Sequence, residues 1–519
     1  MLGKRSSQGK IYDPWTQLSP EAIAGLGFHG KVATEGRNHF HDQDFASMYA
    51  EGGRPSVPPS TLALARLLQV HDRISDAEVV ERCRYDARWK AALDLDLISM
   101  KAPFVKSTFQ AFRVRLTVHE KEGLAFERSV RAAREAGLLP HKLKVALDST
   151  PVRGRGAVKD TFNLLSDAIV SVVRAVASKQ GRQPKKVARE AGVKRHLDAP
   201  SIKGTEVVDW GDREAVSSFL AGLLSDCARV VAIAEKAECA TDEAALLKKV
   251  IADDVQQEPG KPPRIRKGVA KSRTVSVHDP QMRHGRKSSG KVYNGHKAHT
   301  AVEIGSGVIT AVGVTGPDGP DGGQVKDLVD QTKRTTGLPV THAIGDAAYS
   351  TRPALAQAKK ARVDLRTKMP STSRCGLYGA SDFTVSKDRK IAKCPAGVRS
   401  ARTRKTPEGI THFFPPATCR SCALRAQCTK AKNRPQRTLL VPRDFHQRRQ
   451  RERYARSAKG RQFLRQRMAV EHGIGRMKNL GAGVSRYFGR LKTRGQFSWI
   501  AAVANFSLVW ERQKADAMA

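Results

Sequence analysis

Three acidic residues of the chain have neighbours that suit a metal-binding carboxylate: Asp148 in KVALDSTPV, Asp346 in THAIGDAAYS and Glu471 in RQRMAVEHGIGRMKNL. The two aspartates end short apolar runs, a pattern typical of buried strands whose last side chain faces a cleft. Carboxylates suit Mg²⁺, and two divalent ions about 4 Å apart can activate an attacking oxygen and stabilise a leaving one. The three acids therefore predict a site for phosphoryl transfer.

The segment around Glu471 has helical spacing. Arg467 lies four residues before Glu471 and Lys478 seven residues after it, so all three side chains share one helix face. Such a carboxylate could hold a metal ion while the two cations bind phosphates of DNA. Each acid also has a structural interpretation, because Asp148 could cap a turn, Asp346 could cap a helix and Glu471 could pair with Arg467.

The charge of the chain indicates a polyanionic partner. It has 92 Lys and Arg against 50 Asp and Glu, a net charge of +42 and a pI near 10.3. An excess of this size spread over the whole sequence favours nucleic acid as the partner. Only 6% of the residues are aromatic, which argues against binding mainly by stacking single-stranded bases.

Two further basic segments are candidate DNA contacts. The loop HDPQMRHGRKSSGK could follow a phosphate backbone, and a predicted helix near residue 110 could enter a groove. The side chains concerned are Arg283, Arg286, Lys287 and Lys291 in the loop, and Arg113 and Arg115 in the helix. The alternatives are a basic linker and an ordinary helical bundle with solvated charges. Asp279 is a fourth candidate for a metal-binding acid. It is a weaker candidate than the other three because no predicted strand clearly positions it at the site.

The elements that must position these residues have a clear order along the chain. A strand ending at Asp148 is followed, after a long helical stretch, by a hairpin around Gly305, Ser306 and Gly307. A strand ending at Asp346 and a later helix with Glu471 complete the set. This order predicts an α/β fold with a mixed sheet flanked by helices.

Six segments follow from the same patterns. We expect a helical DNA-binding region at 1–140, the sheet at 141–164 and 269–370, a helical insertion at 165–268, a Cys-rich insertion at 371–440 and C-terminal helices at 441–519. The helices at 165–268 interrupt one core, because the strands on either side need each other; a separate domain is the alternative.

The Cys-rich segment is also rich in Gly, Pro and Ser, so we expect a loop-rich stretch that could hold a structural zinc ion. Cys419, Cys422 and Cys428 follow one another in TCRSCALRAQC, and Cys394 lies upstream. Four thiolates can bind zinc tetrahedrally, and a metal would help a segment with few apolar residues to fold. The five-residue gap before Cys428 is not the usual spacing, and Cys375 competes for the fourth place.

The motifs KVALDST, AIGDAAY and R-x3-E-x6-K together resemble the DDE transposases of bacterial insertion sequences, and the layout is similar to the IS-eleven-eighty-two group. The resemblance implies an RNase H-like core in which Asp148, Asp346 and Glu471 bind Mg²⁺ or Mn²⁺. It implies that Arg467 and Lys478 match the basic positions of the Y-x2-R-x3-E-x6-K signature, whose Tyr is replaced by Leu464 here. It also implies binding to terminal inverted repeats and target double-stranded DNA, by a homodimer.

Two other functions remain open at this stage. One is an RNase H-like nuclease or resolvase that cuts without strand transfer, and the other is a non-catalytic DNA-binding protein. The opening MLGKRSSQGK lacks the apolar region of a secretory signal, and no apolar run looks long enough to cross a membrane. We therefore expect a cytoplasmic, nucleoid-associated protein without a membrane partner.

Overall fold

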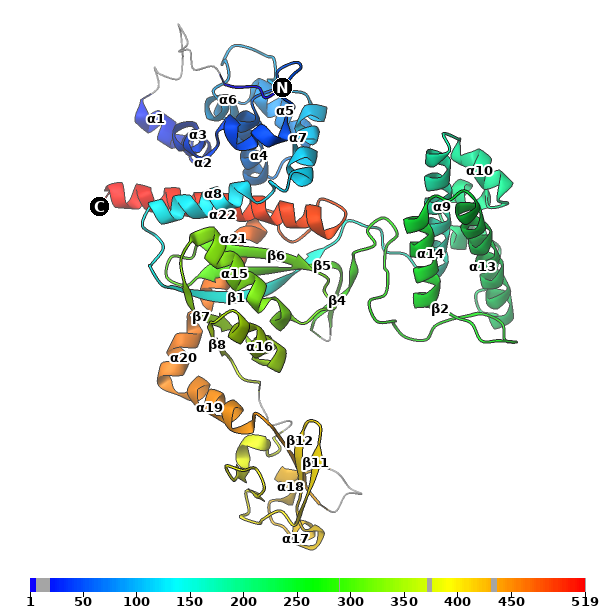
Figure 1. The fold of residues 1–519 in the computed structure, drawn as a ribbon, viewed down its shortest axis with the longest axis vertical. Coiled ribbons are helices and arrows are strands. Elements are labelled where there is room, and N and C mark those ends of the chain that lie inside the picture. The colour runs from blue at the N-terminus through cyan, green and yellow to red at the C-terminus, as the bar shows by residue number, and fades with distance from the viewer. Residues whose placement is uncertain (6–18, 289, 371–375, 431–435, 519) are drawn as a thin grey trace.

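The computed structural model describes residues 1–5, 19–288, 290–370, 376–430 and 436–518 (Figure 1). Cys375, the alternative zinc ligand, lies outside the described residues. A central sheet is covered by helices from both ends of the chain. A helical unit from the middle of the chain and a small unit with short strands project from it in different directions.

Six strands form the central sheet in the order β4-β5-β1-β7-β8, and β6 pairs with β5. Their bounds are Leu143–Arg153 (β1), Arg283–Ser288 (β4), Lys291–Glu303 (β5), Ile309–Thr315 (β6), Val340–Gly345 (β7) and Asp364–Thr367 (β8). β1 is antiparallel to β5 and parallel to β7, which is parallel to β8. The predicted mixed sheet is confirmed, and so is its hairpin, because β5 and β6 pair in antiparallel fashion.

Helices cover both faces of this sheet. On one face lie α15 (Val325–Thr336) and α16 (Arg352–Lys360), and on the other lie α21 (Met468–Asn479) and α22 (Arg490–Met518). Leu143, Val145 and Leu147 of β1 are buried in the first of these cores, whereas Ala146 is buried in the second. Because side chains alternate along a strand, Asp148 points to the same face as Ala146, the face that α21 covers.

The N-terminal helices share one hydrophobic core with the end of the chain. They are α1 (Pro20–Gly25), α2 (Phe28–Lys31), α3 (Arg37–His39), α4 (Pro59–Asp72), α5 (Asp76–Tyr85), α6 (Ala87–Leu93), α7 (Lys106–Val118) and α8 (Leu124–Glu135). Side chains from Val32 to Ala133 form a single buried cluster with Phe497 to Trp510 of α22, and α22 lies along α8 (Figure 1). The N-terminal region is therefore not an independent unit in packing terms.

Asn505 is a buried polar residue of α22 that joins α22 to the sheet. Its Oδ1 accepts a hydrogen bond from Ile309 N at 2.9 Å, and its Nδ2 donates to Ile309 O at 2.9 Å and to Ser129 Oγ at 3.2 Å. The side chain amide thus satisfies both backbone groups at the first residue of β6. It fixes α22 against both the sheet and α8.

The helical unit between β1 and β4 has its own core. It contains α9 (Thr161–Lys179), α10 (Pro184–Glu190), α11 (Arg195–Asp198), α12 (Ile202–Thr205), α13 (Arg213–Lys236) and α14 (Thr241–Asp254), with a two-stranded ribbon of β2 (Val255–Gln256) and β3 (Arg264–Ile265). Apolar side chains of α9, α13 and α14 form a separate buried cluster. The helical periodicity predicted for this stretch is confirmed.

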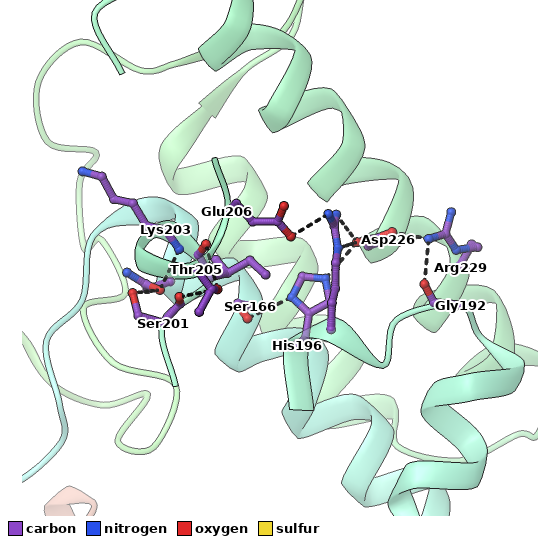
Figure 2. Close-up of polar contacts among 12 residues, drawn as sticks. Ser166, Gly192, His196, Ser201, Lys203, Thr205, Glu206, Asp226 and Arg229 are labelled. Carbon is purple, nitrogen blue, oxygen red and sulfur yellow. Dashed lines mark hydrogen bonds and ion pairs between the residues drawn. The ribbon is translucent and has the colours of Figure 1, made fainter. Parts of the chain in front are cut away.

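A buried polar network joins three of these helices (Figure 2). Ser166 Oγ lies 2.9 Å from His196 Nδ1, and His196 Nε2 lies 2.8 Å from Asp226 Oδ2. Arg195 donates to the same carboxylate at 2.6 Å, and Arg229 pairs with its other oxygen. Because His196 and Asp226 are almost fully buried, this network holds α9, α11 and α13 together.

The Cys-rich segment is a small folded unit, which corrects the expectation of a loop-rich stretch. It contains β9 (Thr384–Val385), β10 (Ala392–Lys393), β11 (Arg402–Thr406), β12 (Gly409–Phe413), β13 (Thr438–Pro442), α17 (Pro416–Arg420) and α18 (Arg425–Cys428). β11, β12 and β13 form one sheet over a core that includes Phe383, Phe414 and Val441. α19 (Phe445–Arg456) and α20 (Ala458–Arg465) lead from it to α21.

Two helices, α9 and α13, are long and apolar enough to cross a membrane by length and composition, which corrects the expectation that no segment is. This is weak support for a membrane span, because core helices pass the same test. The apolar window of α9 is 67% buried, and both helices contribute to the core of the helical unit.

Candidate active site

Asp148 of β1 and Asp346, which directly follows β7, lie near each other at the same end of two parallel strands. The register pairs Ala146 of β1 with Ile344 of β7, and each aspartate lies two residues further along the chain. Neighbouring strands are about 4.8 Å apart. The fold thus brings together two carboxylates that are far apart in the sequence.

The electrostatics of Asp148 reflect this proximity. Burial raises the pKa of Asp148, and the nearby Asp346 charge adds to the rise, whereas the Ser149 backbone N–H and the Arg467 charge act in the opposite direction. The net result is a pKa above the usual value for an aspartate. Two carboxylates in one partly buried place favour a bound cation between them.

Asp346 also has a local structural role. Its Oδ1 accepts a hydrogen bond from Ala348 N at 2.8 Å and caps a short 3-10 turn, η5 (Ala347–Ser350). The following helix, α16, begins later and is capped by Thr351. The cap that the sequence offered as an alternative is therefore present, and it orients the carboxylate beside Asp148.

Glu471 is placed by a close approach of α21 to the sheet. At Gly473, a Cβ atom would lie 2.8 Å from Cγ2 of Val302 on β5, so only glycine allows the helix to lie this close. Val470 and Met477 are buried on the same side, while the side chain of Glu471 is 52% exposed. The helix is held by its apolar face, and its glutamate stays accessible.

Arg467 links the acids of the strand and the helix. Its Nη1 donates to Asp148 Oδ2 at 2.8 Å, and its Nη2 forms an ion pair with Glu471. The Arg467 side chain is 16% exposed, so this guanidinium is largely enclosed. Arg467 therefore contacts both Asp148 and Glu471. These two carboxylates face the same space, and one positive charge lies between them.

The three acids are not drawn into a tight cluster. Within the ranges that the structure describes, one group of three candidate ligands has all its ligand atoms within 4.8 Å of one another, and it consists of His29, His71 and Asp72. The guanidinium of Arg467 lies between Asp148 and Glu471 instead. Metal binding at the three acids therefore requires Arg467 to leave its present position.

The basic residues predicted near the site differ in exposure. Lys478 is exposed near the end of α21. Arg283, Arg286, Lys287 and Lys291 belong to the hairpin of β4 and β5, not to the predicted loop. Arg286, Lys287 and Lys291 are exposed, whereas Arg283 is half-buried and donates to the carbonyl oxygens of Pro280 and Met282.

The two arginines of α7 have different surroundings. Arg113 makes two hydrogen bonds of 2.6 Å to the carboxylate of Asp76 and lies over the rings of Phe109 and Tyr487. The guanidinium of Arg113 is engaged within the protein, and its DNA contact stays a prediction. Arg115 is exposed above the ring of Tyr49 and stays a predicted contact.

Asp279 is fully buried and structural. Its Oδ2 lies 3.2 Å from His296 Nε2 and accepts a hydrogen bond from Gly489 N at 3.1 Å. These hydrogen bonds lower the pKa of Asp279 although burial raises it. The residue anchors the turn before α22, in agreement with its lower rank as a candidate ligand.

Three of the four cysteines lie around one small core. Cys394, Cys419 and Cys428 pack against the cluster that contains Phe383 and Phe414. Burial raises the pKa of the Cys428 thiol, and the other three cysteines contribute to the rise. These thiols are neighbours, although they do not form a group as tight as the one at His29.

The structure has one basic surface that was not predicted from the sequence. Exposed cations follow one another along α19 and α20 toward Glu471, and we call them the α19–α20 basic strip: Arg453, Arg456, Lys459, Arg461 and Arg465. The dense run of Arg in HQRRQRERYARSAKGRQFLRQR was the available signal. Leu464, at the place of the missing signature Tyr, is buried and packs the inner side of α20.

Two family models match the chain. Residues 393–510 match a family described as "Transposase DDE domain", and residues 35–115 match one described as "Transposase domain (DUF772)". The first match includes Glu471 and the four cysteines, and the second includes α4 to α6. No curated protein matches the sequence.

Both matches are to transposase families. They support its assignment to the DDE-type transposases of insertion sequences, and the IS-eleven-eighty-two-like group is consistent with them.

Proposed function

We propose that this transposase binds the terminal inverted repeats of its element, cleaves DNA at the element ends and joins the freed 3′ hydroxyls to target DNA. The observation that carries the proposal is the register of Asp148 opposite Asp346, with Glu471 approaching the same face of the sheet through Arg467. An RNase H-like core is the fold that this arrangement supports best.

The residues of the site would have different roles in the proposed reaction. Divalent ions such as Mg²⁺ or Mn²⁺, which DDE transposases generally use, would supply Lewis acidity to the attacking and leaving oxygens. Asp148 and Asp346 would hold them from the sheet and Glu471 from α21. The raised pKa of Asp148 fits this role, because a carboxylate beside another acid gains most from a nearby cation. Arg467, released from Asp148, could then bind a phosphate of the scissile strand.

Exposed cations would hold the DNA around this centre. The α19–α20 basic strip leads to the site along one side, and Arg286, Lys287 and Lys291 extend from the hairpin. Lysine and arginine contacts to phosphates position a duplex without reading its sequence. Arg115 and the N-terminal helices would contribute recognition, a dimer would pair the two ends, and the protein would work in the cytoplasm on the nucleoid.

We also propose that Cys394, Cys419, Cys422 and Cys428 bind a structural zinc ion. Its support is that Cys394, Cys419 and Cys428 pack against one small core of six buried residues, and that Cys422 contributes with them to the raised pKa of the Cys428 thiol. Zinc content of the purified protein, compared with a Cys419→Ser/Cys422→Ser variant, tests this. Equal zinc content in both proteins would contradict the proposal.

The catalytic proposal is tested with the full-length protein and duplex DNA that carries the inverted repeats flanking its gene. The cleavage rate should fall roughly 10³-fold or more in each of the variants Asp148→Asn, Asp346→Asn and Glu471→Gln, because the activation barrier rises by several kcal/mol. Each variant should still bind DNA. Glu235→Gln is the control, because Glu235 is exposed on α13 and pairs only with exposed Lys248. Unchanged cleavage by Glu471→Gln would contradict the catalytic assignment and favour a non-catalytic DNA-binding protein.

Strand transfer separates a transposase reaction from that of a nuclease or resolvase. Precut end DNA with a free 3′ hydroxyl should be joined to a supercoiled plasmid by the parent protein but not by Asp346→Asn. Cleavage of uncut ends without any joined product would favour the nuclease.

A further inference from the structure

Three N-terminal helices meet at the carboxylate of Asp72, far along the chain from the proposed catalytic acids. His29 Nε2 of α2 lies 3.1 Å from Asp72 Oδ2, and His71 Nδ1 lies 2.8 Å from Asp72 Oδ1. Trp89 of α6 donates its indole N–H to Asp72 Oδ2 at 2.7 Å. The carboxylate at the end of α4 is thus surrounded by groups from two other helices.

The donor set fits a transition metal ion. The two imidazole nitrogens and the carboxylate oxygen all lie within 4.8 Å of one another. Zinc bonds to nitrogen and oxygen ligands are about 2.0–2.2 Å long, so two ligands in a tetrahedron are roughly 3.3 Å apart. The contacts of His29 and His71 with Asp72 are already close to this separation. Two nitrogen donors favour zinc or a similar ion over Mg²⁺.

The surroundings hold the three ligands in place. The ring of Phe28 stacks on His71 with centroids 4.1 Å apart, and the indole of Trp89 orients the Asp72 carboxylate. A hydrogen bond from a neighbouring group to a ligating carboxylate is typical of metal sites.

The site is enclosed but reachable. The side chain of His29 is 5% exposed and that of Asp72 15%, while that of His71 is 32% exposed. An ion can therefore enter on the His71 side, where water could complete its coordination. The helices it would connect are held otherwise by apolar packing, and α2 is only four residues long.

We propose that His29, His71 and Asp72 form a binding site for one transition metal ion, with zinc as the expected occupant. The ion would fix the short helix α2 to the end of α4 in the N-terminal helical region. This site is separate from both the catalytic acids and the four cysteines. A hydrogen-bonded cluster without metal is the competing interpretation, and metal uptake distinguishes the two.

The experiment uses full-length protein with the Cys419→Ser/Cys422→Ser background, stripped with chelator and titrated with Zn²⁺ or Co²⁺ in the absence of Mg²⁺ and DNA. We expect one equivalent to bind and to raise the thermal unfolding temperature. Trp89 is buried against the ligands, so bound Co²⁺ should quench its fluorescence, and Trp89→Phe should reduce this quenching, with the remainder coming from Trp510, which packs on Phe28.

His71→Gln is the decisive variant because His71 is the most exposed ligand and its loss should leave the fold intact. It should weaken metal binding by more than about 100-fold, the upper range for loss of a supporting group. His119→Gln, at an exposed histidine that ends α7, is the matched control and should bind like the parent. Equal binding by His71→Gln and the parent, in protein with the same circular dichroism, would overturn the proposal. Asp148→Asn should retain this site, which keeps the result independent of the catalytic proposal.

Discussion

Arg467 donates a hydrogen bond to Asp148 across 2.8 Å, although the two residues are 319 positions apart in the chain. The same guanidinium pairs with Glu471. The protein thereby compensates the charge of two of its three proposed metal ligands with a side chain of its own. Any cation that binds the acids has to compete with Arg467.

Replacing Arg467 should change the pH dependence of cleavage. The Arg467 charge lowers the pKa of Asp148, which burial and Asp346 raise, so Arg467→Gln should raise that pKa further. Asp148 binds metal only when deprotonated, and the acidic limb of the cleavage rate should therefore move to higher pH. Rates measured from pH 5 to pH 9 at DNA concentrations well below saturation check this, because they report the pKa values of the free protein. Arg465→Gln removes a nearby charge without the Asp148 pair, and a shift of equal size there would contradict the argument.

Two glycines of α21 provide a matched test of how the helix positions Glu471. A Cβ at Gly473 would lie 2.8 Å from Val302, whereas a Cβ at Gly475 would meet nothing within 4 Å. Gly473→Ala should move α21 away from the sheet and reduce cleavage by roughly 10²-fold, as small misplacements of reacting groups do. Gly475→Ala should keep activity and gain up to about 1 kcal/mol of stability. Equal activity of the two variants would show that the close approach is not needed.

Asn505→Ala should destabilise the whole N-terminal and C-terminal core. The substitution leaves the backbone N–H and C=O of Ile309 buried without their partner, at a cost of roughly 2–4 kcal/mol. Urea unfolding followed by circular dichroism measures the loss. Asn479→Ala, at an exposed position that ends α21, should change stability by less than about 0.5 kcal/mol.

Asp226 should stabilise the helical unit in a pH-dependent way. Hydrogen bonds from His196 and Arg195 lower its pKa, although burial raises it. Because the folded pKa lies below the unfolded value, near 3.9, this stabilisation is complete above that value and is lost as the pH falls through the folded pKa. Asp226→Asn should cost roughly 3–5 kcal/mol at pH 7 and little in strong acid.

Trp210 is a local reporter for that measurement, because its ring packs against Phe162 and Phe219 within the helical unit. Asp198→Asn is the control, since its pair with Lys194 is about half exposed and should contribute at most about 1 kcal/mol. A constant difference between Asp226→Asn and the parent from pH 7 to pH 2 would contradict the linkage.

The sequence predicted the parts of the fold that depend on local pattern. Alternating and apolar runs predicted β1, β7 and the hairpin of β5 and β6, and helical spacing predicted the pairing of Arg467 with Glu471. Short strands with few apolar residues were not predicted from the sequence. β11 to β13 lie in the stretch that was expected to consist mainly of loops. The hairpin that carries Arg286 was also taken for a loop because polar residues dominate it.

Contacts between distant segments could not be predicted from one sequence. Nothing in the local pattern of α7 shows that Arg113 pairs with Asp76 of α5. Likewise, the link between Arg467 and Asp148 arises only when α21 packs on β1. The spacing of His71 and Asp72 shows a pair of donors, but His29 joins them through tertiary packing alone.

The position of α22 in the core determines when the N-terminal helices can complete their folding during translation. The ribosome releases α22 after all the helices and strands that precede it, yet Phe497 to Trp510 belong to the same buried cluster as side chains from Val32 onward. The N-terminal helices therefore expose apolar surface until α22 has been made. A chain terminated before α22 would be a substrate for chaperones and proteases.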